Sequence, residues 1–170
     1  GKINKFKTAG HELGSHTITH PDLTTLTTTQ VNNELSQSKT YLQNTFGVPI
    51  NYFATPYGAY NKAVKDRIMA YYTVHRTVDT GYNSKDNFDV TKLKVQNILD
   101  TTTPEEVAGW AKKAYDEKTW LILVYHRVAN DPEAYDTTPA KFQGQMQAIK
   151  TQNIPVKTIT QALAELQPQR

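Results

Sequence analysis

Segments with strand-like and helix-like patterns alternate along this chain of 170 residues, and this order restricts the fold more than any other feature. Extended patterns are expected around 12–14 and at 52–55, 73–78, 93–99, 120–125 and 154–156. Helical patterns are expected at 27–47, 62–71, 103–114, 138–149 and 160–166. Repeated strand-then-helix order without a linker predicts one domain with a barrel-like α/β fold.

Local signals mark several helix ends. Thr27 and Gln30 have the spacing of a capping box, and Gly47 is a typical helix stop. Thr103 followed by Pro104 and Glu106 combines a capping threonine, a proline in the first turn and a capping glutamate. These signals predict two capped helices. The apolar run at 120–125 (WLILVY) predicts a strand buried on both faces of a parallel sheet.

The charge and composition of the chain indicate which kinds of molecule it is expected to bind. The formal net charge is +3 and the basic residues are dispersed, so no nucleic-acid partner is expected. No apolar run approaches a membrane span, so no membrane insertion is expected. Ten Tyr and two Trp among many polar residues suit a neutral, sugar-like polymer, although such residues are more often ordinary core aromatics. The absence of cysteine excludes thiolate catalysis and cysteine-ligated zinc.

Two histidines, His16 and His20, stand four positions apart after the first expected strand. Neutral imidazole is a common ligand of zinc, and one oxygen donor would complete an open site, but chance also supplies this spacing. Asp79 and His126 likewise follow expected strands, where chemistry is located in barrel-like α/β folds. His75 lies inside a strand, which is typical of a hydrogen-bonded structural histidine.

Four segments of the chain form an ordered series of motifs: residues 10–23 (GHELGSHTITHPDL), 56–58 (PYG), 78–81 (VDTG) and 123–126 (LVYH). In this order they resemble motifs two to five of the polysaccharide deacetylases, a family of metal-dependent carbohydrate esterases that includes chitin and peptidoglycan deacetylases. The resemblance spans nearly the whole chain and implies a distorted (β/α) barrel. It also implies that 1–170 is a single catalytic domain of this type.

The resemblance assigns the metal and the oxyanion site. It implies that His16 and His20 bind a divalent metal, usually zinc, with cobalt, nickel and manganese as alternatives. It implies that the backbone N–H of Tyr57 donates to the tetrahedral oxyanion. Pro56 and Gly58 would shape the turn that presents Tyr57 to substrate.

The resemblance also assigns proton transfer. It implies that His126 protonates the leaving amine and that Asp79 holds the imidazole in its working tautomer. Val124, or else Leu123, would line the acetate pocket.

Two departures from the family pattern matter. The opening Thr-Phe-Asp-Asp-Gly motif, which supplies the catalytic base and a carboxylate ligand, is missing, and the chain contains no Asp-Asp pair. We therefore expect an N-terminally truncated domain, lacking its first strand, helix and second strand, with an incomplete barrel and little activity by itself. Either the full-length protein or another polypeptide would supply the missing segment, or the chain is a variant with a rearranged site. The second departure is Ala54, where the family often has an arginine that orients the base.

The leading functional hypothesis is a hydrolase of linear amides that removes acetyl groups from N-acetylglucosamine-containing polysaccharide, such as chitin, peptidoglycan or an exopolysaccharide. The alternative is a degenerate, non-catalytic module that binds glycan or metal, and a third possibility is an α/β domain with coincidental histidines. Because the substrates implied by the resemblance lie outside the cytoplasm, a secreted or cell-surface bacterial protein is expected.

Overall fold

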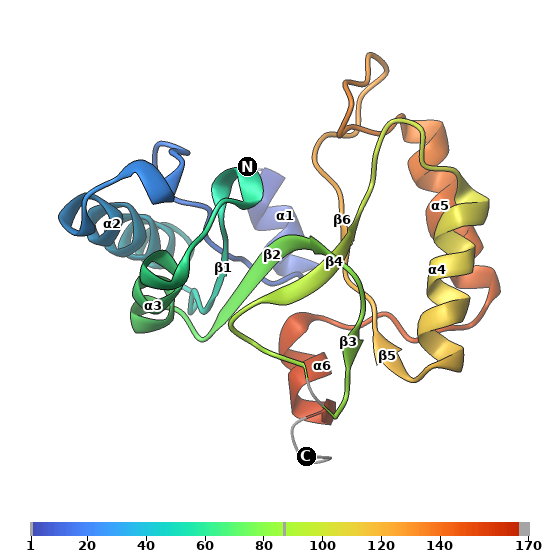
Figure 1. Cartoon of the computed structure of the whole chain (residues 1–170). Helices are drawn as coiled ribbons and strands as arrows, with labels where there is room; N and C mark the ends of the chain where they lie inside the picture. The colour runs from blue at the N-terminus through green and yellow to red at the C-terminus, as the bar shows by residue number, and fades with distance from the viewer. Residues whose placement is uncertain (1, 87, 167–170) are drawn as a thin grey trace. The chain divides into compact units, whose positions relative to one another are not determined.

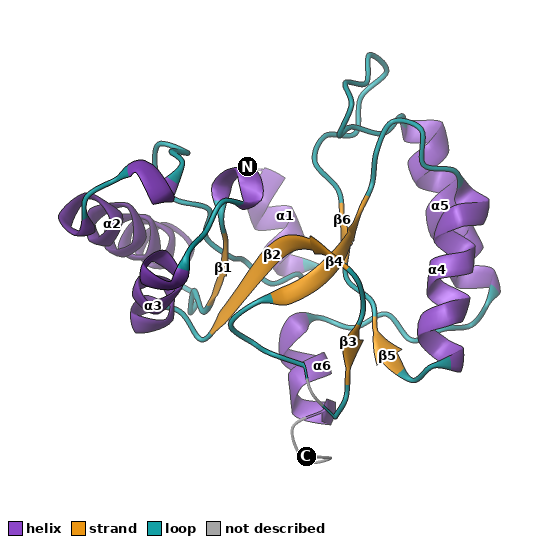
Figure 2. Ribbon diagram, viewed as in Figure 1, coloured by secondary structure: helices purple, strands orange, loops and turns teal. Residues whose placement is uncertain are grey.

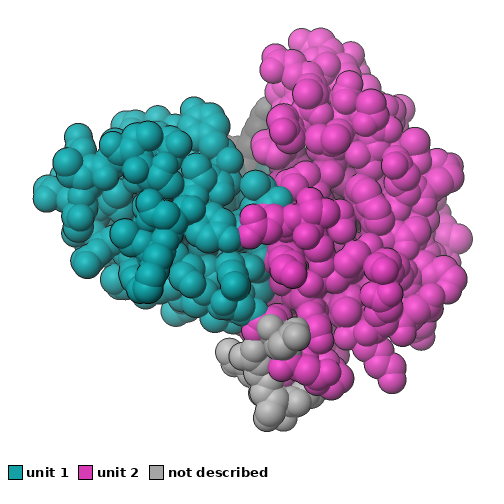
Figure 3. All heavy atoms as spheres, viewed as in Figure 1, with its two compact units in different colours: residues 1–78, 89–93 teal, residues 79–88, 94–170 magenta. Residues whose placement is uncertain are grey.

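Helices and strands alternate along the chain in the computed structural model, which describes residues 2–86 and 88–166 (Figures 1 and 2). The α/β fold predicted from the sequence is confirmed. The contacts divide the chain into unit 1, residues 1–78 and 89–93, and unit 2, residues 79–88 and 94–170 (Figure 3). The assignment of 1–170 to a single catalytic domain stays a prediction. In the described ranges, no helix has the length and apolar character needed to cross a membrane.

Unit 1 combines helices of different lengths with a parallel strand pair. β1 (Tyr52–Ala54) pairs in parallel with β2 (Val74–Thr80), and the register places Ala54 opposite Arg76. The helical elements are α1 (Lys2–Thr8), the 3-10 helix η1 (Leu23–Thr25), α2 (Thr28–Phe46), the 3-10 helix η2 (Pro56–Gly58) and α3 (Lys62–Tyr71).

The predicted boundaries of α2 are confirmed. The hydroxyl of Thr27 accepts the backbone N–H of Gln30, and the Gln30 side chain accepts the N–H of Thr27, so the capping box is complete. Gly47 ends the helix in the left-handed region at φ 62°. This capped helix presents Val31, Leu35 and Ser38 to the interior.

The core of unit 1 forms where α2 and α3 cover β1. Phe53 of β1 and Tyr72 after α3 are both buried, with ring centroids 4.9 Å apart. The other buried members of this cluster are Leu23, Val31, Leu35, Ile50, Val64 and Ile68. Apolar residues at helical spacing in α2 and α3 therefore meet the strand that precedes the Pro56–Gly58 turn.

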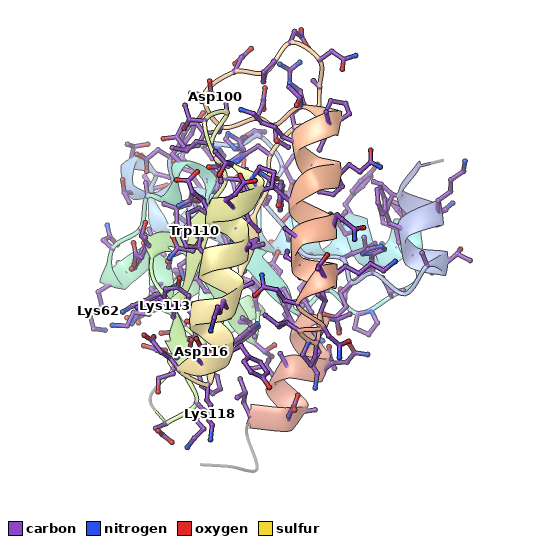
Figure 4. The ribbon with its side chains drawn as sticks, turned by 90° about the vertical axis from the view of Figure 1, so that its right-hand side faces the viewer. Lys62, Asp100, Trp110, Lys113, Asp116 and Lys118 are labelled. Carbon is purple, nitrogen blue, oxygen red and sulfur yellow. The ribbon has the colours of Figure 1, made fainter. Side chains whose placement is uncertain are left out.

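Unit 2 contains a second parallel pair, a short antiparallel pair and three helices. β4 (Leu93–Asn97) pairs in parallel with β6 (Leu123–Val124), and β3 (Asn83–Ser84) pairs antiparallel with β5 (Thr119–Trp120). The helices are α4 (Pro104–Asp116), α5 (Pro139–Thr151) and α6 (Ile159–Leu166). α4 and α5 lie side by side (Figure 1), and Figure 4 shows Trp110, Lys113 and Asp116 along α4.

The helix predictions in unit 2 are confirmed. Thr103 and Glu106 form the second capping box at the start of α4, with Pro104 in its first turn. Thr138 caps α5 by accepting the N–H of Lys141, and α6 begins one residue before the predicted Thr160.

Three strand predictions are wrong. Residues 154–156, between α5 and α6, form no strand. Residues 120–125 do not form one buried strand, because Trp120 pairs with β3 while Leu123 and Val124 pair with β4. The change of partner interrupts the strand, and of these residues only Val124 is buried. The strand expected around residues 12–14 is reduced to an isolated parallel bridge between Ser15 and Phe53.

Candidate functional site

The histidine segment is anchored at Ser15. The Ser15 N–H donates to the Tyr52 carbonyl at 2.8 Å, and the Ser15 carbonyl accepts the Ala54 N–H at 3.1 Å. The buried Ser15 hydroxyl donates to the hydroxyl of Ser38 on α2 at 2.8 Å. Backbone and side chain thus tie the residue before His16 to both β1 and α2.

The two histidines converge through their Nε2 atoms. His16 Nδ1 lies 2.8 Å from the Ala54 carbonyl oxygen, which can only accept, so this nitrogen carries the proton and the neutral ring has its lone pair on Nε2. His20 Nε2 lies 3.1 Å from His16 Nε2, and the ring centroids are 4.8 Å apart. Two imidazole nitrogens bound to one tetrahedral zinc, at about 2.0–2.1 Å each, are about 3.3 Å apart. The pair therefore fits a shared metal ion.

The pair supplies only part of a ligand set. Among residues 2–86 and 88–166, no three His, Cys, Asp or Glu side chains form a group that could hold a metal ion. A donor beyond His16 and His20 is therefore needed, whether a carboxylate or water.

The loop between the histidines has unusual backbone conformations. Thr17 and His20 both have positive φ, at 69° and 58°. Such positions cost on the order of 1–3 kcal/mol for residues other than glycine and persist only where the surroundings fix them. Thr17 Oγ1 accepts the His20 N–H at 3.0 Å, which closes the loop on itself.

Glu34, which was not among the predicted site residues, reaches this loop from α2. Its carboxylate accepts the Ile18 N–H at 2.7 Å, the Thr19 N–H at 3.1 Å and the Thr19 hydroxyl at 2.6 Å. The available signal was that Glu34 is the only acidic residue in α2 and precedes the buried Leu35. That signal does not identify the loop as its partner.

The predicted substrate turn lies beside the histidines in unit 1. Pro56 is buried, Tyr57 has φ 57° and is 71% exposed, and Gly58 has φ 67°. The Gly58 N–H donates to the Thr55 carbonyl. Within the described ranges, the Tyr57 N–H has no acceptor, so it is available to a ligand. The Tyr57 and His20 ring centroids are 4.7 Å apart, which places the turn next to the proposed metal ligands.

His75 has the structural role expected of it. It is buried in β2, with Nε2 3.0 Å from Thr55 Oγ1 and Nδ1 2.8 Å from the Thr91 carbonyl. Because a carbonyl only accepts, Nδ1 carries the proton and Nε2 accepts from the Thr55 hydroxyl. Both ring nitrogens are satisfied, and the residue braces the segment before the Pro56–Gly58 turn.

The remaining predicted residues belong to unit 2. Asp79 is exposed and lies inside β2, which extends to Thr80, rather than after the strand. Val124 is buried at the end of β6. His126 is exposed two residues beyond β6, and its ring lies 5.4 Å from that of Tyr135. The pairing of Asp79 with His126 and the acetate pocket at Val124 stay predictions.

The segment that follows His126 is braced by Arg127. Its Nε donates to Asp136 Oδ2 at 2.9 Å, and the Glu133 N–H donates to the same carboxylate oxygen at 2.9 Å. Chiefly through the backbone hydrogen bond from Glu133, and also through Arg127, these contacts lower the pKa of Asp136. The Asp136 carboxylate therefore fixes the loop that carries Tyr135 by binding both Arg127 and Glu133.

Comparisons with known proteins agree with these motifs. Residues 1–74 match the family model for polysaccharide deacetylase. A chitin deacetylase of a Pestalotiopsis species is 28% identical over 80 residues, which cover 46% of this chain and 27% of that protein. The uncharacterised Bacillus subtilis protein YlxY is 39% identical over 80 residues, covering 45% of this chain and 24% of YlxY. The matched stretch thus spans about a quarter of these two relatives.

The fold extends the similarity to nearly the whole chain. The Xyl-CE4 domain of a multidomain xylanase, from the hindgut metagenome of Trinervitermes trinervoides, superposes with a TM-score of 0.63 at 17% identity. The superposition covers 96% of this chain and 69% of that domain. Residues 1–74 are therefore similar in sequence to the polysaccharide deacetylase family, and the chain as a whole shares its α/β fold with the Xyl-CE4 domain.

Proposed function

We propose that this protein acts as a metal-dependent hydrolase that removes acetyl groups from polysaccharide containing N-acetylglucosamine. The observation that carries the proposal is the convergence of His16 Nε2 and His20 Nε2, 3.1 Å apart and beside the Tyr57 turn. The similarity of residues 1–74 to the polysaccharide deacetylase family, and of the chain to a chitin deacetylase, supports the assignment to the hydrolases. Zinc is the metal we favour, before cobalt, nickel or manganese.

In this proposal, separate residues bind the metal, stabilise the oxyanion and transfer the proton. His16 and His20 would hold the metal, which when bound polarises the acetyl carbonyl and water. The N–H of Tyr57, a residue at φ 57°, would donate to the developing oxyanion. His126 would donate a proton to the leaving amine nitrogen, and Asp79 would keep its imidazole in the required tautomer.

Zinc binding tests the metal part of this proposal. We expect calorimetric titration of the chain with Zn²⁺ to show one site, which His16→Ala and His20→Ala each abolish. His11→Ala is the matched control, because His11 is also exposed but packs against Phe6 instead of the pair. Absence of zinc binding by the wild-type chain contradicts the metal assignment.

The second candidate is a non-catalytic module that binds glycan or metal. It is favoured by the incomplete ligand set among the residues that the structure describes. Release of acetate from acetylated chitin oligomers and peptidoglycan by the full-length protein decides between the two candidates. Acetate release that His126→Ala suppresses supports the hydrolase, whereas binding of the oligomers without acetate release supports the module.

The substrate class leads to a proposed location. Acetylated polysaccharides of this kind lie outside the cytoplasm, so we propose that the protein is secreted or held at the bacterial cell surface. Fractionation of the producing cells, followed by antibody detection of the chain, tests this. Recovery in the cytoplasmic fraction alone contradicts it.

A further inference from the structure

Glu34 binds the loop between the two histidines but touches neither imidazole. Its carboxylate takes two backbone N–H groups and one hydroxyl, all from Ile18 and Thr19. Both carboxylate oxygens are thereby engaged, Oε2 by the two amides and Oε1 by the hydroxyl. The carboxylate is thus directed at the loop and not at the space between the imidazoles.

This loop depends on polar contacts for its shape. It begins and ends with residues at positive φ, Thr17 and His20, which isolated chains avoid. The Ile18 side chain is 50% exposed, so little apolar burial holds the loop in place. The contacts that fix it are the bond from the His20 N–H to Thr17 Oγ1 and the three bonds to Glu34.

The charge of Glu34 suits this role. Partial burial opposes ionisation, but the hydrogen bonds from Thr19 and Ile18 outweigh it and lower the pKa of the carboxyl below its ordinary value. Glu34 is therefore an anion at neutral pH, and hydrogen bonds to an anion are stronger than those between neutral groups.

The position of Glu34 on α2 connects the loop to the core. The next residue, Leu35, is fully buried, and Ser38 one turn later bonds to the Ser15 hydroxyl. The same helix therefore holds the chain before His16, through Ser38, and the chain before His20, through Glu34. One helix thus contacts the histidine segment at two places, through Ser38 and through Glu34.

We propose that Glu34 is a positioning residue that keeps the imidazoles of His16 and His20 at the spacing that a shared divalent cation requires. This inference rests on the proposed metal site, which it deepens by assigning the residue that preforms it. Substitution of Glu34 keeps both histidines in the chain but removes the hydrogen bonds that fix the loop between them.

Two measurements on purified chains test this role. The first is the affinity for Zn²⁺ alone, by calorimetry, for wild type, Glu34→Ala and Glu34→Gln. Loss of a partner that orients metal ligands typically costs about 10–100-fold in metal affinity, so Glu34→Ala should raise the Kd for zinc at least about tenfold. Glu34→Gln, which keeps one acceptor oxygen, should fall between. Gln37→Ala, an exposed position of the same helix, is the matched control and should leave the Kd within about twofold.

The second measurement needs no metal. The His16 and His20 rings, 4.8 Å apart, should give a ring-to-ring nuclear Overhauser effect in the wild-type chain. Glu34→Ala should lose this effect and keep the one between Phe53 and Tyr72, whose centroids are 4.9 Å apart in the core. If Glu34→Ala also loses the core effect, it is unfolded and Glu34→Gln decides.

The outcomes separate the two proposals. A wild-type chain that binds no zinc contradicts the metal assignment, and the ring-to-ring effect then decides the role of Glu34. Unchanged zinc affinity together with an unchanged His16–His20 effect in a folded Glu34→Ala chain overturns the role of Glu34 and leaves the metal site standing.

Discussion

Left-handed backbone conformations gather around the candidate site. Thr17, His20 and Tyr57 have φ between 57° and 69°, although none is a glycine. Each such residue costs on the order of 1–3 kcal/mol, and such costs are typically found where function requires a particular geometry. Two of these three residues, His20 and Tyr57, have a role in the proposed chemistry.

Gly58 is required by two separate constraints. Its φ is +67°, and an added Cβ would lie 2.0 Å from Val78 Cγ2. We expect Gly58→Ala to lower the free energy of unfolding by about 2–5 kcal/mol, from strain and overpacking together. Gly47→Ala, at φ +62° with no atom within 4 Å, isolates the strain and should cost only about 1–2 kcal/mol. Urea denaturation gives both values, and equal losses would rule out the clash with Val78.

Tyr125 carries a hydroxyl that is buried without a partner among the described residues. Burial raises its pKa to about 12. We expect Tyr125→Phe to stabilise the chain by about 1 kcal/mol, because an unpaired buried hydroxyl is removed while the edge contact with Phe142 remains. Urea denaturation near pH 8 measures this, and a less stable variant contradicts it.

Tyr125 also predicts a dependence on alkaline pH. The raised pKa means that the unfolded chain loses this proton first, so stability is retained below the ordinary pKa of about 10 and is lost as pH rises toward 12. The advantage of Tyr125→Phe should therefore grow above about pH 10. A constant difference between the two chains at all pH values argues against a buried hydroxyl.

At the scale of elements, the helices are the best predicted parts. Thr27 with Gln30 and Thr103 with Glu106 form the capping boxes that their spacing indicates. Such contacts lie within four residues of one another, so the local sequence contains both partners. The strand at 120–125 was mispredicted because its partners, β3 and β4, lie far away in the sequence.

The segment 127–137 forms no helix or strand, and an ion pair between Arg127 and Asp136 joins its two ends. The Arg127 guanidinium and the Glu133 N–H both bond to Asp136, whose pKa is lowered mainly by the Glu133 bond. A lowered pKa contributes stability above the unfolded value, near 3.9, that is lost as pH falls through the folded pKa.

We therefore expect Asp136→Asn to be less stable than wild type at about pH 6, with the difference shrinking below about pH 4. Denaturation curves at several pH values measure it. Asp131→Asn is the control, because Asp131 lies 3.4 Å from Arg127 but its side chain is 85% exposed, and exposed pairs contribute little. A difference between wild type and Asp136→Asn that persists undiminished at about pH 3 contradicts this account.

At the scale of the whole molecule, stability in unit 1 comes from one apolar cluster on which the site is built. Leu35 is fully buried in this cluster. Its backbone carbonyl accepts a hydrogen bond from the Tyr72 hydroxyl at 2.8 Å. The helix that fills the core thus also carries Ser38 and Glu34, so packing and site geometry depend on the same element.

Leu35→Ala should lower the free energy of unfolding by about 2–5 kcal/mol, through lost burial and the cavity left behind. Val156→Ala, at an apolar side chain that is 81% exposed, should change it by less than about 0.5 kcal/mol. Urea denaturation of both variants tests the contrast, and a small loss for Leu35→Ala would show that the cluster contributes little.

The sequence by itself determined the α/β class, the capped helices and the motif that contains His16, His20 and the Pro56–Gly58 turn. These features depend on residue types at short spacings, where each partner is near in the chain. Only the tertiary structure brought the two Nε2 atoms to 3.1 Å, placed Tyr57 against His20 and showed Glu34 bound to the loop. The contacts of Glu34 with Thr19 and of Tyr57 with His20 join residues 15 and 37 positions apart, through strand pairing and helix packing that no local pattern specifies. The two histidines are only four positions apart, but the conformation of the loop between them depends on the contact with Glu34.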